Sequence, residues 1–415
     1  MTKAANQPIL IIGAGLVGLT MANLLAKQGF SVRIIDKEAP DTSYDDAIGL
    51  RVSAINKTSQ KLFEDLGLWS AMQNLRMGPY ERMLVWDEGS EAHIEMDAAE
   101  VGETTLGFII ENHLMLKVLF EGLEAYPKEQ VQFILDTPIA LKEHNTGWEL
   151  ELASGQIIEA SLLIAADGSK SWVRSAVHIE SSTHDFQQQA LVCTVRCEKP
   201  HRFTARQRFL ESGPLAFLPL HDSHLCSIVW STSKEQAENL AGLPDDEFNT
   251  ALEKAFWIPG SAERPQDDSS TSVGIQTSAL GKLQVIGFRA HYPLSQHHAK
   301  HYVKKGLALI GDAAHSIHPL AGQGVNLGFA DAKALAEVLT QAKLKGRTIA
   351  SESTLLQYQR SRKHYNAAIM WSMYGFNTLF SNRLATLARL REIGVNAVDK
   401  QSFIKRFFIK QAMDS

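Results

Sequence analysis

The sequence predicts an α/β protein in which a parallel-sheet domain is interrupted by a second, sheet-based domain and followed by a helical segment. Three observations support this prediction. The first is a strand, glycine turn, helix and second strand at the N-terminus, over residues 8–36. The second is a stretch rich in strand formers from about 186 to 297. The third is one more buried strand, "GLALIGD", which precedes a long helix with apolar periodicity.

The N-terminal unit starts with "PILII", turns at "GAGLVG", continues as a helix to Lys27 and returns as "FSVRIID". Gly13, Gly15 and Gly18 place the pattern G-x-G-x-x-G between strand and helix, and Asp36 ends the second strand. The first glycine makes the tight turn, the second admits a pyrophosphate, the third allows close helix packing, and the carboxylate accepts from ribose hydroxyls. This unit predicts a Rossmann-like dinucleotide-binding domain, and it fits NAD and FAD equally well.

The remaining elements follow in chain order. Residues 50–76 and 111–126 have helical patterns, and "RMLVWD" and "AHIEMD" between them alternate as strands do. "VQFIL", "WELELA" and "QIIEASLLIAADG" are strand-like. Five apolar positions mark the helix after the second glycine loop: Val325, Leu327, Leu335, Val338 and Leu339. The expected division of the chain is 1–78, 106–185 and 298–350 for the nucleotide-binding domain, 79–105 and 186–297 for the inserted domain, and 351–415 for the C-terminal helical region.

Length and composition are those of an ordinary globular protein of more than one domain. The chain has 415 residues, of which 45% are hydrophobic and 21% charged. Its 41 basic and 46 acidic residues give a net charge of −5, which disfavours a nucleic-acid partner. The three cysteines, Cys193, Cys197 and Cys226, indicate buried free thiols and a reducing compartment. The apolar run at 8–26 has three glycines and no clear cleavage site, so we expect a folded segment of a cytoplasmic protein.

A second glycine-rich stretch, "GDAAHSIHPLAGQGVNLG", covers residues 311–328. It could hold a metal ion on His315 and His318, or it could form a backbone cradle for a bulky cofactor. The metal interpretation lacks a third ligand at a fixed spacing, and Pro319 suits a rigid turn, so no metal site is predicted. The nearby run of histidines at 297, 298 and 301 is interpreted in the same way, as a solvated connector and not a ligand set.

"LIAADGSKSWVR" at 163–174 and "GLALIGDAAHSIHPLAGQGVNLGFADAKAL" at 306–335 resemble the two further motifs of the FAD-dependent aromatic hydroxylases, the class A flavoprotein monooxygenases. The resemblance implies FAD as the cofactor and NAD(P)H as a co-substrate. It also implies roles for residues at the matching positions. Asp312, after Gly311, would hold the ribityl chain, and Asp167 with Gly168 would assist both FAD and the reduced pyridine nucleotide.

The loop from Pro319 to Asn326 would lie against the isoalloxazine ring, with Arg51 near the flavin. A helix that begins near Gly324 directs N–H groups and the positive end of its dipole at the ring, where reduction places negative charge. The full set of expected cofactor-binding residues is Gly13, Gly15, Gly18, Asp36, Lys37, Arg51, Asp167, Gly168, Gly311, Asp312, Pro319, Gly322, Gly324, Val325 and Asn326.

Within this family, "HAKHYVKKGLALIGDAAHSIHPLAGQGVNLG" and "RQRFLESGPLAFLPL" resemble the ubiquinone-biosynthesis hydroxylases of the UbiH, UbiF, UbiI and VisC group. "RVSAIN", "MGPYERMLVWD", "MDAAE" and "LGFIIENHLM" are most similar to members that act on a 3-demethoxyubiquinol. The resemblance implies that NAD(P)H reduces the flavin, that O2 adds to form a C4a-hydroperoxide, and that one oxygen atom is transferred to the ring of a prenylated quinol or phenol. The prenyl tail implies an apolar channel, which strand 214–220 would wall.

Several alternatives stay open. No catalytic base is identified, although His318 or a tyrosine are candidates. The protein could perform another ring hydroxylation of the same pathway, serve as a non-hydroxylating flavin-binding subunit, or act as a quinone reductase. Near the C-terminus, four apolar residues share a helical face that basic residues surround, which suits either an anionic membrane surface or packing on protein. These are Phe403, Ile404, Phe407 and Phe408 on the face, with Lys400, Lys405, Arg406 and Lys410 around it.

Overall fold

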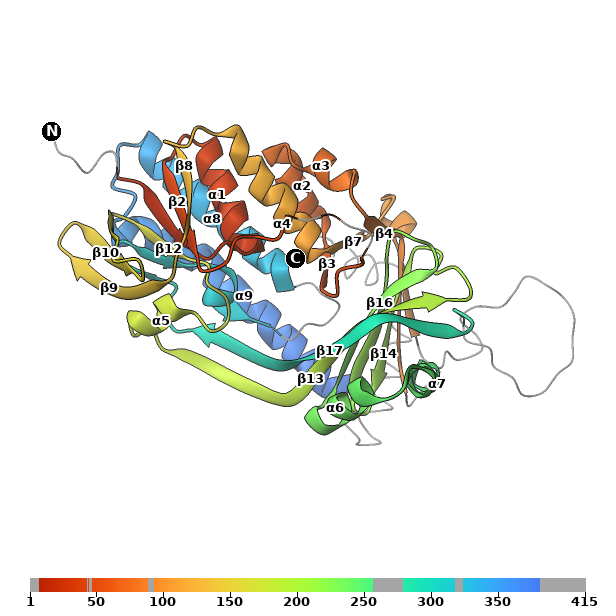
Figure 1. Cartoon of the computed structure of the whole chain (residues 1–415). Helices are drawn as coiled ribbons and strands as arrows, with labels where there is room; N and C mark the ends of the chain where they lie inside the picture. The colour runs from red at the N-terminus through yellow and green to blue at the C-terminus, as the bar shows by residue number, and fades with distance from the viewer. Residues whose placement is uncertain are drawn as a thin grey trace, which may run out of the picture.

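The computed structural model describes residues 7–42, 44, 47–88, 93–256, 279–317 and 324–380. Its elements form two parts, a parallel sheet covered by helices and a larger, mostly antiparallel sheet, which two long strands connect (Figure 1). The mixed α/β fold and the inserted sheet agree with the sequence-based prediction. The precise domain boundaries given above remain expectations.

The first sheet has the strand order β18-β19-β12-β1-β2-β8. Its strands are β1 (Ile9–Ile12), β2 (Val32–Asp36), β8 (Val131–Leu135), β12 (Leu163–Ala165), β18 (Val303–Lys304) and β19 (Leu307–Leu309). All neighbours are parallel except β18 and β19. Strands β1, β12 and β19 are buried along their whole length, which explains why their sequences are continuous apolar runs and do not alternate.

Helices pack around this sheet and against one another. Helix α1 (Leu16–Lys27) contacts α4 (Asn112–Glu121) and α8 (Gly324–Leu344), and α8 in turn contacts α9 (Glu352–Phe380). Shorter helices are α2 (Lys57–Leu66), α3 (Trp69–Gln73) and α5 (Trp172–Ala176), with 3-10 turns at Ala98–Val101 (η2), Gly122–Ala125 (η3) and Gly311–Ala313 (η4). Among the described helices, none combines the length and apolar character needed to cross a membrane.

Two three-stranded sheets border the first part. One has the order β11-β10-β9, formed by β9 (Pro138–His144), β10 (Gly147–Leu152) and β11 (Ile157–Ala160). The other has the order β3-β7-β4, formed by β3 (Val52–Ile55), β4 (Met77–Tyr80) and β7 (Gly107–Glu111). This second small sheet lies where the two parts of the molecule meet (Figure 1).

The large sheet has the order β20-β17-β13-β16-β15-β14-β5-β6. Its strands are β5 (Arg82–Asp87), β6 (His93–Asp97), β13 (Ser181–Cys197), β14 (Thr204–Leu210), β15 (Gly213–Pro219), β16 (Leu225–Ser233), β17 (Leu283–Ala299) and β20 (His315–Ser316). One face packs in an apolar cluster with α6 (Lys234–Gly242) and α7 (Asp245–Ala255). The opposite face packs against the small β3-β7-β4 sheet.

Strands β13 and β17 connect the two parts. Each is 17 residues long, and they pair with each other from Ser181 and Ala299 at one end to Cys197 and Leu283 at the other. In Figure 1 the pair extends from the parallel-sheet part to the large sheet. Both strands therefore run across the expected boundaries at 185/186 and 297/298.

The structure corrects three sequence-based expectations. Residues 52–55, assigned to a helical segment, form strand β3, which pairs with β7. The inserted region also contains two helices, α6 and α7, which the strand-rich composition did not indicate. The histidine run is not a solvated connector, because His297 and His298 belong to β17 and His297 is buried. The three cysteines are buried and free, as expected.

Candidate functional site

Three glycine-containing motifs meet at one edge of the first sheet. Gly13 follows β1, Asp167 follows β12 and Gly311 follows β19, and these three strands are parallel neighbours. Backbone hydrogen bonds continue past the strand ends: the N–H of Gly13 donates to Ile35, that of Ala166 to Ile12 and that of Ile310 to Ala165. Ligands of open parallel sheets bind at the carboxyl ends of the strands, so this edge is the candidate site.

The first loop has the close approaches that its glycines predict. Gly13 has φ +106°, and a Cβ there would lie 2.4 Å from the carbonyl oxygen of Ala166. A Cβ on Gly18 would lie 2.0 Å from the carbonyl oxygen of Gly13. By contrast, a Cβ on Gly15 would meet no atom of the described residues within 4 Å. The loop is therefore packed under its first and third glycines and open above its second, where a pyrophosphate would approach.

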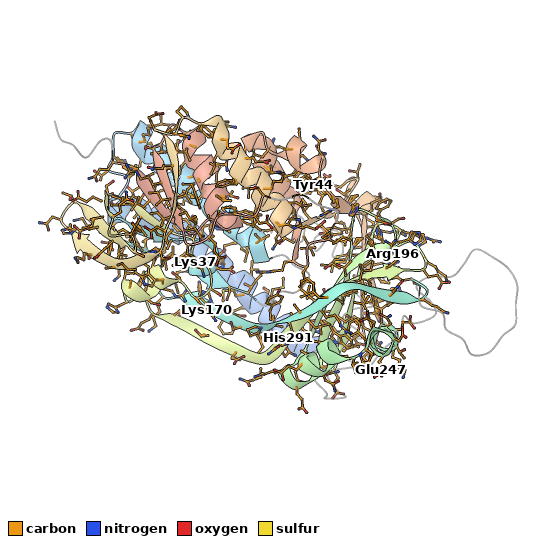
Figure 2. All side chains as sticks on the ribbon, in the orientation of Figure 1. Lys37, Tyr44, Lys170, Arg196, Glu247 and His291 are labelled. Carbon is orange, nitrogen blue, oxygen red and sulfur yellow. The ribbon has the colours of Figure 1, made fainter. Side chains whose placement is uncertain are left out.

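Asp36 ends β2, and Lys37 follows it. The Asp36 carboxylate accepts from the N–H of Ala14 at 2.6 Å, so it is fixed to the glycine loop at the start of α1. The exposed side chain of Lys37 forms an ion pair with Glu38 at 3.5 Å (Figure 2). Asp36 thus lies beside the predicted phosphate cradle, whereas the ammonium group of Lys37 is directed to a surface partner.

Asp167 has an unsatisfied buried oxygen atom. Its Oδ2 accepts from the N–H of Val173 at 3.0 Å, whereas Oδ1 is buried and has no partner among the described residues. Desolvation raises the pKa of this carboxyl, against the lowering effect of hydrogen bonds from Ser171 and Val173. Gly168 follows with φ +79° and open space around it. An unpaired carboxylate oxygen beside an open turn is suited to a ligand that donates hydroxyl hydrogen bonds.

Gly311 and Asp312 form the 3-10 turn η4 after β19. Gly311 packs against Val17 of α1, which brings this turn next to the first glycine loop. Asp312 is solvent-exposed, yet the surrounding protein restricts its hydration enough to raise its pKa, while the charges of His315 and Arg51 oppose that rise. The guanidinium carbon of Arg51 lies 5.7 Å from the ring centre of Tyr292 on β17. The carboxylate of Asp312, the guanidinium of Arg51 and the ring of Tyr292 therefore lie in the neighbourhood of this turn.

Helix α8 begins at Gly324, as the sequence predicts. Asn326 in its first turn is buried, and its amide donates to the carbonyl of Ala54 at 2.8 Å, while its oxygen accepts from the hydroxyl of Ser59 at 2.7 Å. Asn326 therefore fixes the N-terminus of α8 to β3 and α2, and Val325 beside it is half-buried. Pro319 and Gly322, expected to line the flavin ring, lie outside the described residues, as does His318.

A buried ionic network around Asp331 lies behind η4 and was not predicted from the sequence. Asp331 of α8 is fully buried, and its Oδ2 accepts from the N–H of Gly311 at 3.2 Å and from His315 at 2.6 Å. Its Oδ1 accepts from Arg362 at 2.8 Å and from Asn366 at 3.0 Å, both on α9.

Desolvation of Asp331 acts to raise its pKa, but His315 and Arg362 outweigh it and lower the pKa. The carboxylate is therefore charged and ties both ends of the turn at 311–315 to two helices. The sequence did contain a signal: Asp331 stands between Leu327 and Leu335, at the spacing of the buried stripe.

A second buried cluster supports the same region from β17. Arg174 of α5 donates to the carbonyls of Ala313 at 2.8 Å and Ser169 at 2.7 Å, and its guanidinium lies 3.2 Å from Nε2 of His297. The other ring nitrogen of His297 lies 2.8 Å from the hydroxyl of Ser316. Desolvation and the charge of Arg174 lower the pKa of His297 to about 4, so the ring is neutral near pH 7.

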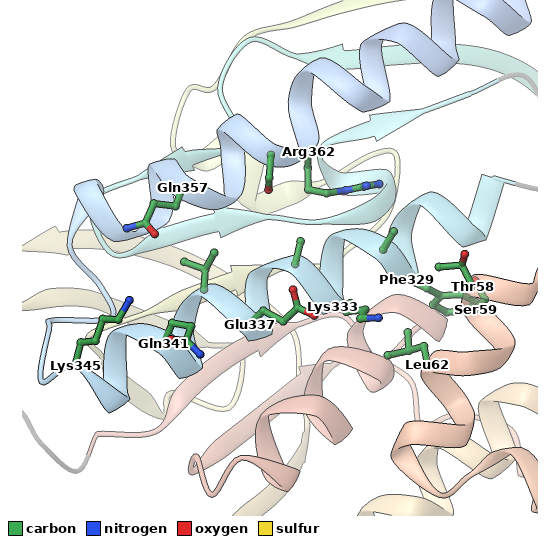
Figure 3. A pocket seen from close by; sticks show the side chains of 14 residues that line it. Thr58, Ser59, Leu62, Phe329, Lys333, Glu337, Gln341, Lys345, Gln357 and Arg362 are labelled. Atoms are coloured by element: carbon green, nitrogen blue, oxygen red, sulfur yellow. The ribbon is translucent and has the colours of Figure 1, made fainter. Parts of the chain in front are cut away.

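A larger cavity lies elsewhere in the described structure. It is an open groove of about 510 Å³ between α2, α8 and α9, with Lys333, Glu337 and Arg362 among its lining residues (Figure 3). None of the expected cofactor-binding residues lines it. We therefore assign the candidate site to the strand ends and not to this groove.

These residues fit FAD. The open backbone above Gly15 suits the pyrophosphate, and the unpaired Oδ1 of Asp167 and the exposed carboxylate of Asp312 suit hydroxyl groups. The arrangement supports a long ligand that spans the carboxyl ends of β1, β12 and β19 and reaches the junction with the large sheet. The Nε2 atom of His315 lies 2.6 Å from Asp331 and 2.8 Å from Asn366, so this nitrogen is engaged by protein groups.

Comparisons with known proteins agree with this assignment. Residues 6–372 match the protein-family model described as an FAD binding domain. The chain is 37% identical over 411 residues to the 3-demethoxyubiquinol 3-hydroxylase of Escherichia coli (strain K12), which covers 98% of this chain and 99% of that protein. It is 33% identical to the human mitochondrial ubiquinone biosynthesis monooxygenase COQ6, over 96% of this chain and 90% of that protein.

Solved structures share the fold. The p-nitrophenol 4-monooxygenase PnpA from Pseudomonas putida superposes with a TM-score of 0.75, covering 99% of this chain and 98% of that one at 18% identity. HpxO from Klebsiella pneumoniae, solved with FAD and uric acid, gives 0.70 at 18% identity and covers 99% and 98% of the two chains. At such low identity the likeness shows the fold alone.

Proposed function

The chain belongs to the FAD binding domain family and to the hydroxylases of ubiquinone biosynthesis within it, and from this membership we propose the reaction that it catalyses. It is an FAD-dependent monooxygenase that hydroxylates the aromatic ring of a prenylated quinol or phenol and uses NAD(P)H and O2. The observation that carries the proposal is the convergence of three motifs, around Gly13, Asp167 and Gly311, on one edge of the sheet.

The substrate proposed is a 3-demethoxyubiquinol. The support is the name of the Escherichia coli relative, which aligns along almost the whole chain. COQ6 relatives align nearly as fully and at slightly lower identity, so another ring hydroxylation of the same pathway is the second candidate. The identity of the accumulated quinone distinguishes the two.

The protein contributes binding, orientation and control of charge. When bound, FAD accepts electrons from NAD(P)H and activates O2, so that one oxygen atom is transferred to the substrate ring. The Gly13–Gly18 loop and the N-terminus of α1 bind the pyrophosphate, and Asp36 accepts from the adenosine ribose. Asp312 and Asp167 bind hydroxyl groups, and Arg51 and the N-terminus of α8 provide positive potential for a reduced, anionic ring.

The prenyl tail requires an apolar wall, and β15 supplies one. Every residue of Gly213–Pro219 is buried. Ala216 and Leu218 of this strand face the junction between the large sheet and the β3-β7-β4 sheet. This placement supports the expectation that the sheet domain shields the substrate from water.

Product analysis tests the proposal. Purified protein is expected to be yellow, to retain FAD, and to consume NAD(P)H faster when 3-demethoxyubiquinol with a short prenyl chain is present. With 18O2, one labelled oxygen atom is expected in the product. A reductase would consume NAD(P)H without labelling the product, and a non-hydroxylating flavin-binding subunit would show neither reaction. Colourless protein that takes up no FAD would overturn the whole proposal.

We also propose that the C-terminal segment binds an anionic membrane surface, which would bring the enzyme to its lipid-soluble substrate. The support is the alternation of aromatic and basic residues from Lys400 to Lys410. These residues lie outside the described ones. The test is flotation with liposomes that contain anionic lipid: full-length protein is expected to float and a chain truncated after Val398 is not. Equal flotation of both would remove the membrane role.

A further inference from the structure

We propose that Tyr80 and Gln207 form the polar end of the substrate site and bind one ring hydroxyl of the quinol. This inference rests on the proposed function and adds to it the residues that orient the ring. It starts from a small cavity between the β3-β7-β4 sheet and the large sheet. Ala54, Tyr80 and Ile109 line it from the small sheet, and the large sheet contributes Met83, Ala205, Arg206, Gln207, Ala216 and Leu218.

Neither the hydroxyl of Tyr80 nor the Oε1 of Gln207 has a hydrogen-bond partner among the described residues. Gln207 is 4% exposed, and its Oε1 is buried without a hydrogen bond. Tyr80 is 6% exposed, and its hydroxyl makes no hydrogen bond to another described residue. A buried polar group without a partner destabilises the folded protein, so the unpaired Oε1 of Gln207, in a cavity that Tyr80 also lines, indicates a binding site for a ligand.

The size and polarity of the cavity indicate which chemical group of a ligand would bind there. Its volume is about 10 Å³, which is room for a single oxygen atom with its hydrogen. Desolvation raises the pKa of Tyr80 to about 12, so its phenol keeps its proton and acts as a donor near pH 7. The Oε1 of Gln207 is an acceptor. A hydroxyl group satisfies both, because it accepts from Tyr80 and donates to Gln207.

The residues around the cavity leave room for an aromatic ring that carries this hydroxyl group. Gly107 leaves room for the phenol of Tyr80, since a Cβ at residue 107 would lie 2.9 Å from the tyrosine oxygen. Three lining residues are alanines, Ala54, Ala205 and Ala216, and Met83 is a flexible side chain that can move aside. Apolar walls with one polar end orient a quinol by its oxygen.

The cavity is also next to the cofactor site. Ala54 contributes its side chain to the cavity, and its carbonyl accepts from Asn326 at the start of α8. Arg51, three residues earlier, is at the N-terminal end of the same β3 segment, and its charge acts on Asp312. One short strand therefore links the hydroxyl cavity to the start of α8, so a ring held at Tyr80 and Gln207 would be adjacent to an isoalloxazine bound at the N-terminus of that helix.

The test compares Tyr80→Phe with Tyr358→Phe, a matched change at another buried tyrosine. The hydroxyl of Tyr358 donates to the carbonyl of Leu309 at 2.8 Å and lines no part of this cavity. Removing the unpaired hydroxyl of Tyr80 is expected to leave Tm unchanged or raise it by about 1–2 °C, and to lower kcat/KM for 3-demethoxyubiquinol about tenfold or more. Tyr358→Phe is expected to lower Tm and leave kcat/KM within about twofold.

Gln207→Met gives a second, independent variant, since it keeps the length of the side chain and removes the carboxamide. It is expected to behave as Tyr80→Phe does, with FAD content unchanged in both. A lower Tm in either variant would mean that the groups hold a structural water molecule, and an unchanged kcat/KM would mean that they do not touch the substrate; either result overturns this inference. If the unaltered protein makes no hydroxylated product, the proposed function itself fails.

Discussion

At the scale of single residues, different glycines of the nucleotide loop serve folding and binding: Gly13 and Gly18 are packed against protein, and Gly15 is open to a ligand. The first and third glycines are enclosed by protein atoms, whereas the second faces open space with an ordinary backbone conformation, φ −74°. Substitutions at these neighbouring positions should therefore have different consequences, although all three glycines belong to one motif.

Gly15→Val is expected to leave the folded protein nearly as stable as before, because a Cβ at this position meets no described atom within 4 Å. It is expected to abolish FAD binding, because the side chain fills the space over the pyrophosphate cradle. Thermal unfolding of the apoprotein and the ratio of flavin to protein absorbance measure the two effects. Gly13→Ala is the control: its Cβ would collide with Ala166, so it should lower Tm as well. Normal flavin content in Gly15→Val would contradict the cradle assignment.

Asp331→Asn tests the buried network behind η4. The substitution leaves Arg362 without its charged partner, and breaking a buried ion pair in this way costs about 3 kcal/mol of unfolding free energy. Because Asp331 also accepts from Gly311, we expect weaker FAD retention in addition to the lower stability.

Glu337→Gln on the exposed face of the same helix is the matched control and should change stability by less than about 0.5 kcal/mol. Urea unfolding and equilibrium dialysis of FAD provide the measurements. If Asp331→Asn loses stability and keeps its FAD affinity, the carboxylate supports the helices without positioning the turn.

At the scale of elements, sequence patterns predicted those whose signal is local. The βαβ unit, β8, β10, β19 and α8 all match their predicted segments, because continuous apolar runs and apolar periodicity are properties of the segment itself. Strand β3 was misread because its four residues, VSAI, are too few to show alternation and lead directly into α2. Its strand character depends on pairing with β7, more than fifty residues away.

The residues of the candidate site were also predictable only where their signal in the sequence is local. The motif glycines and Asp167 could be found because each follows a recognisable strand. The position of Asp331 within an apolar stripe is a sequence signal for a buried charge, but its partners are not. Tyr80 and Gln207 had no signal, since their roles depend on which side chains tertiary packing brings next to them. The unpaired state of a buried group is a property of the folded molecule and has no local sequence signal.

Strand β17 makes the stability of the protein dependent on pH. Desolvation is the largest cause that lowers the pKa values of His297 and His298 to about 4, from 6.5 for an unburied histidine. As pH falls, the unfolded chain therefore takes up these protons before the folded one does. The stabilisation is complete above pH 6.5 and decreases as pH falls from 6.5 to about 4.

We accordingly expect Tm to fall between pH 7 and pH 4.5, with a smaller fall in the double variant His297→Gln, His298→Gln. Differential scanning calorimetry across this range measures it. His144→Gln, which changes a histidine that is about half exposed, serves as control and should leave the pH dependence as it is. Identical profiles for the double variant and the unaltered protein would contradict the assignment to these two residues.

At the scale of the whole molecule, the cofactor contacts segments that are far apart in the chain. FAD should therefore stabilise the protein as a unit by mass action, by about 2.7 kcal/mol at a free concentration one hundred times its Kd. For a chain of this length, this corresponds to a rise in Tm of about 3 °C. Thermal unfolding with increasing FAD measures it, and ADP alone, which reaches only the first loop, should need higher concentrations. A Tm independent of FAD would contradict the three-segment site.

The strand order of the first sheet also has a consequence for how the protein is made in the cell. Strand β19, which carries the last of the three motifs, is translated roughly three hundred residues after the loop that follows β1. At ribosomal speeds of about 5–20 residues per second, the nascent chain waits about 15–60 s before that pocket can close. Flavin loading is thus a late event in biosynthesis, and until then the apolar edge of β12 has no neighbour and is open to pairing with other chains.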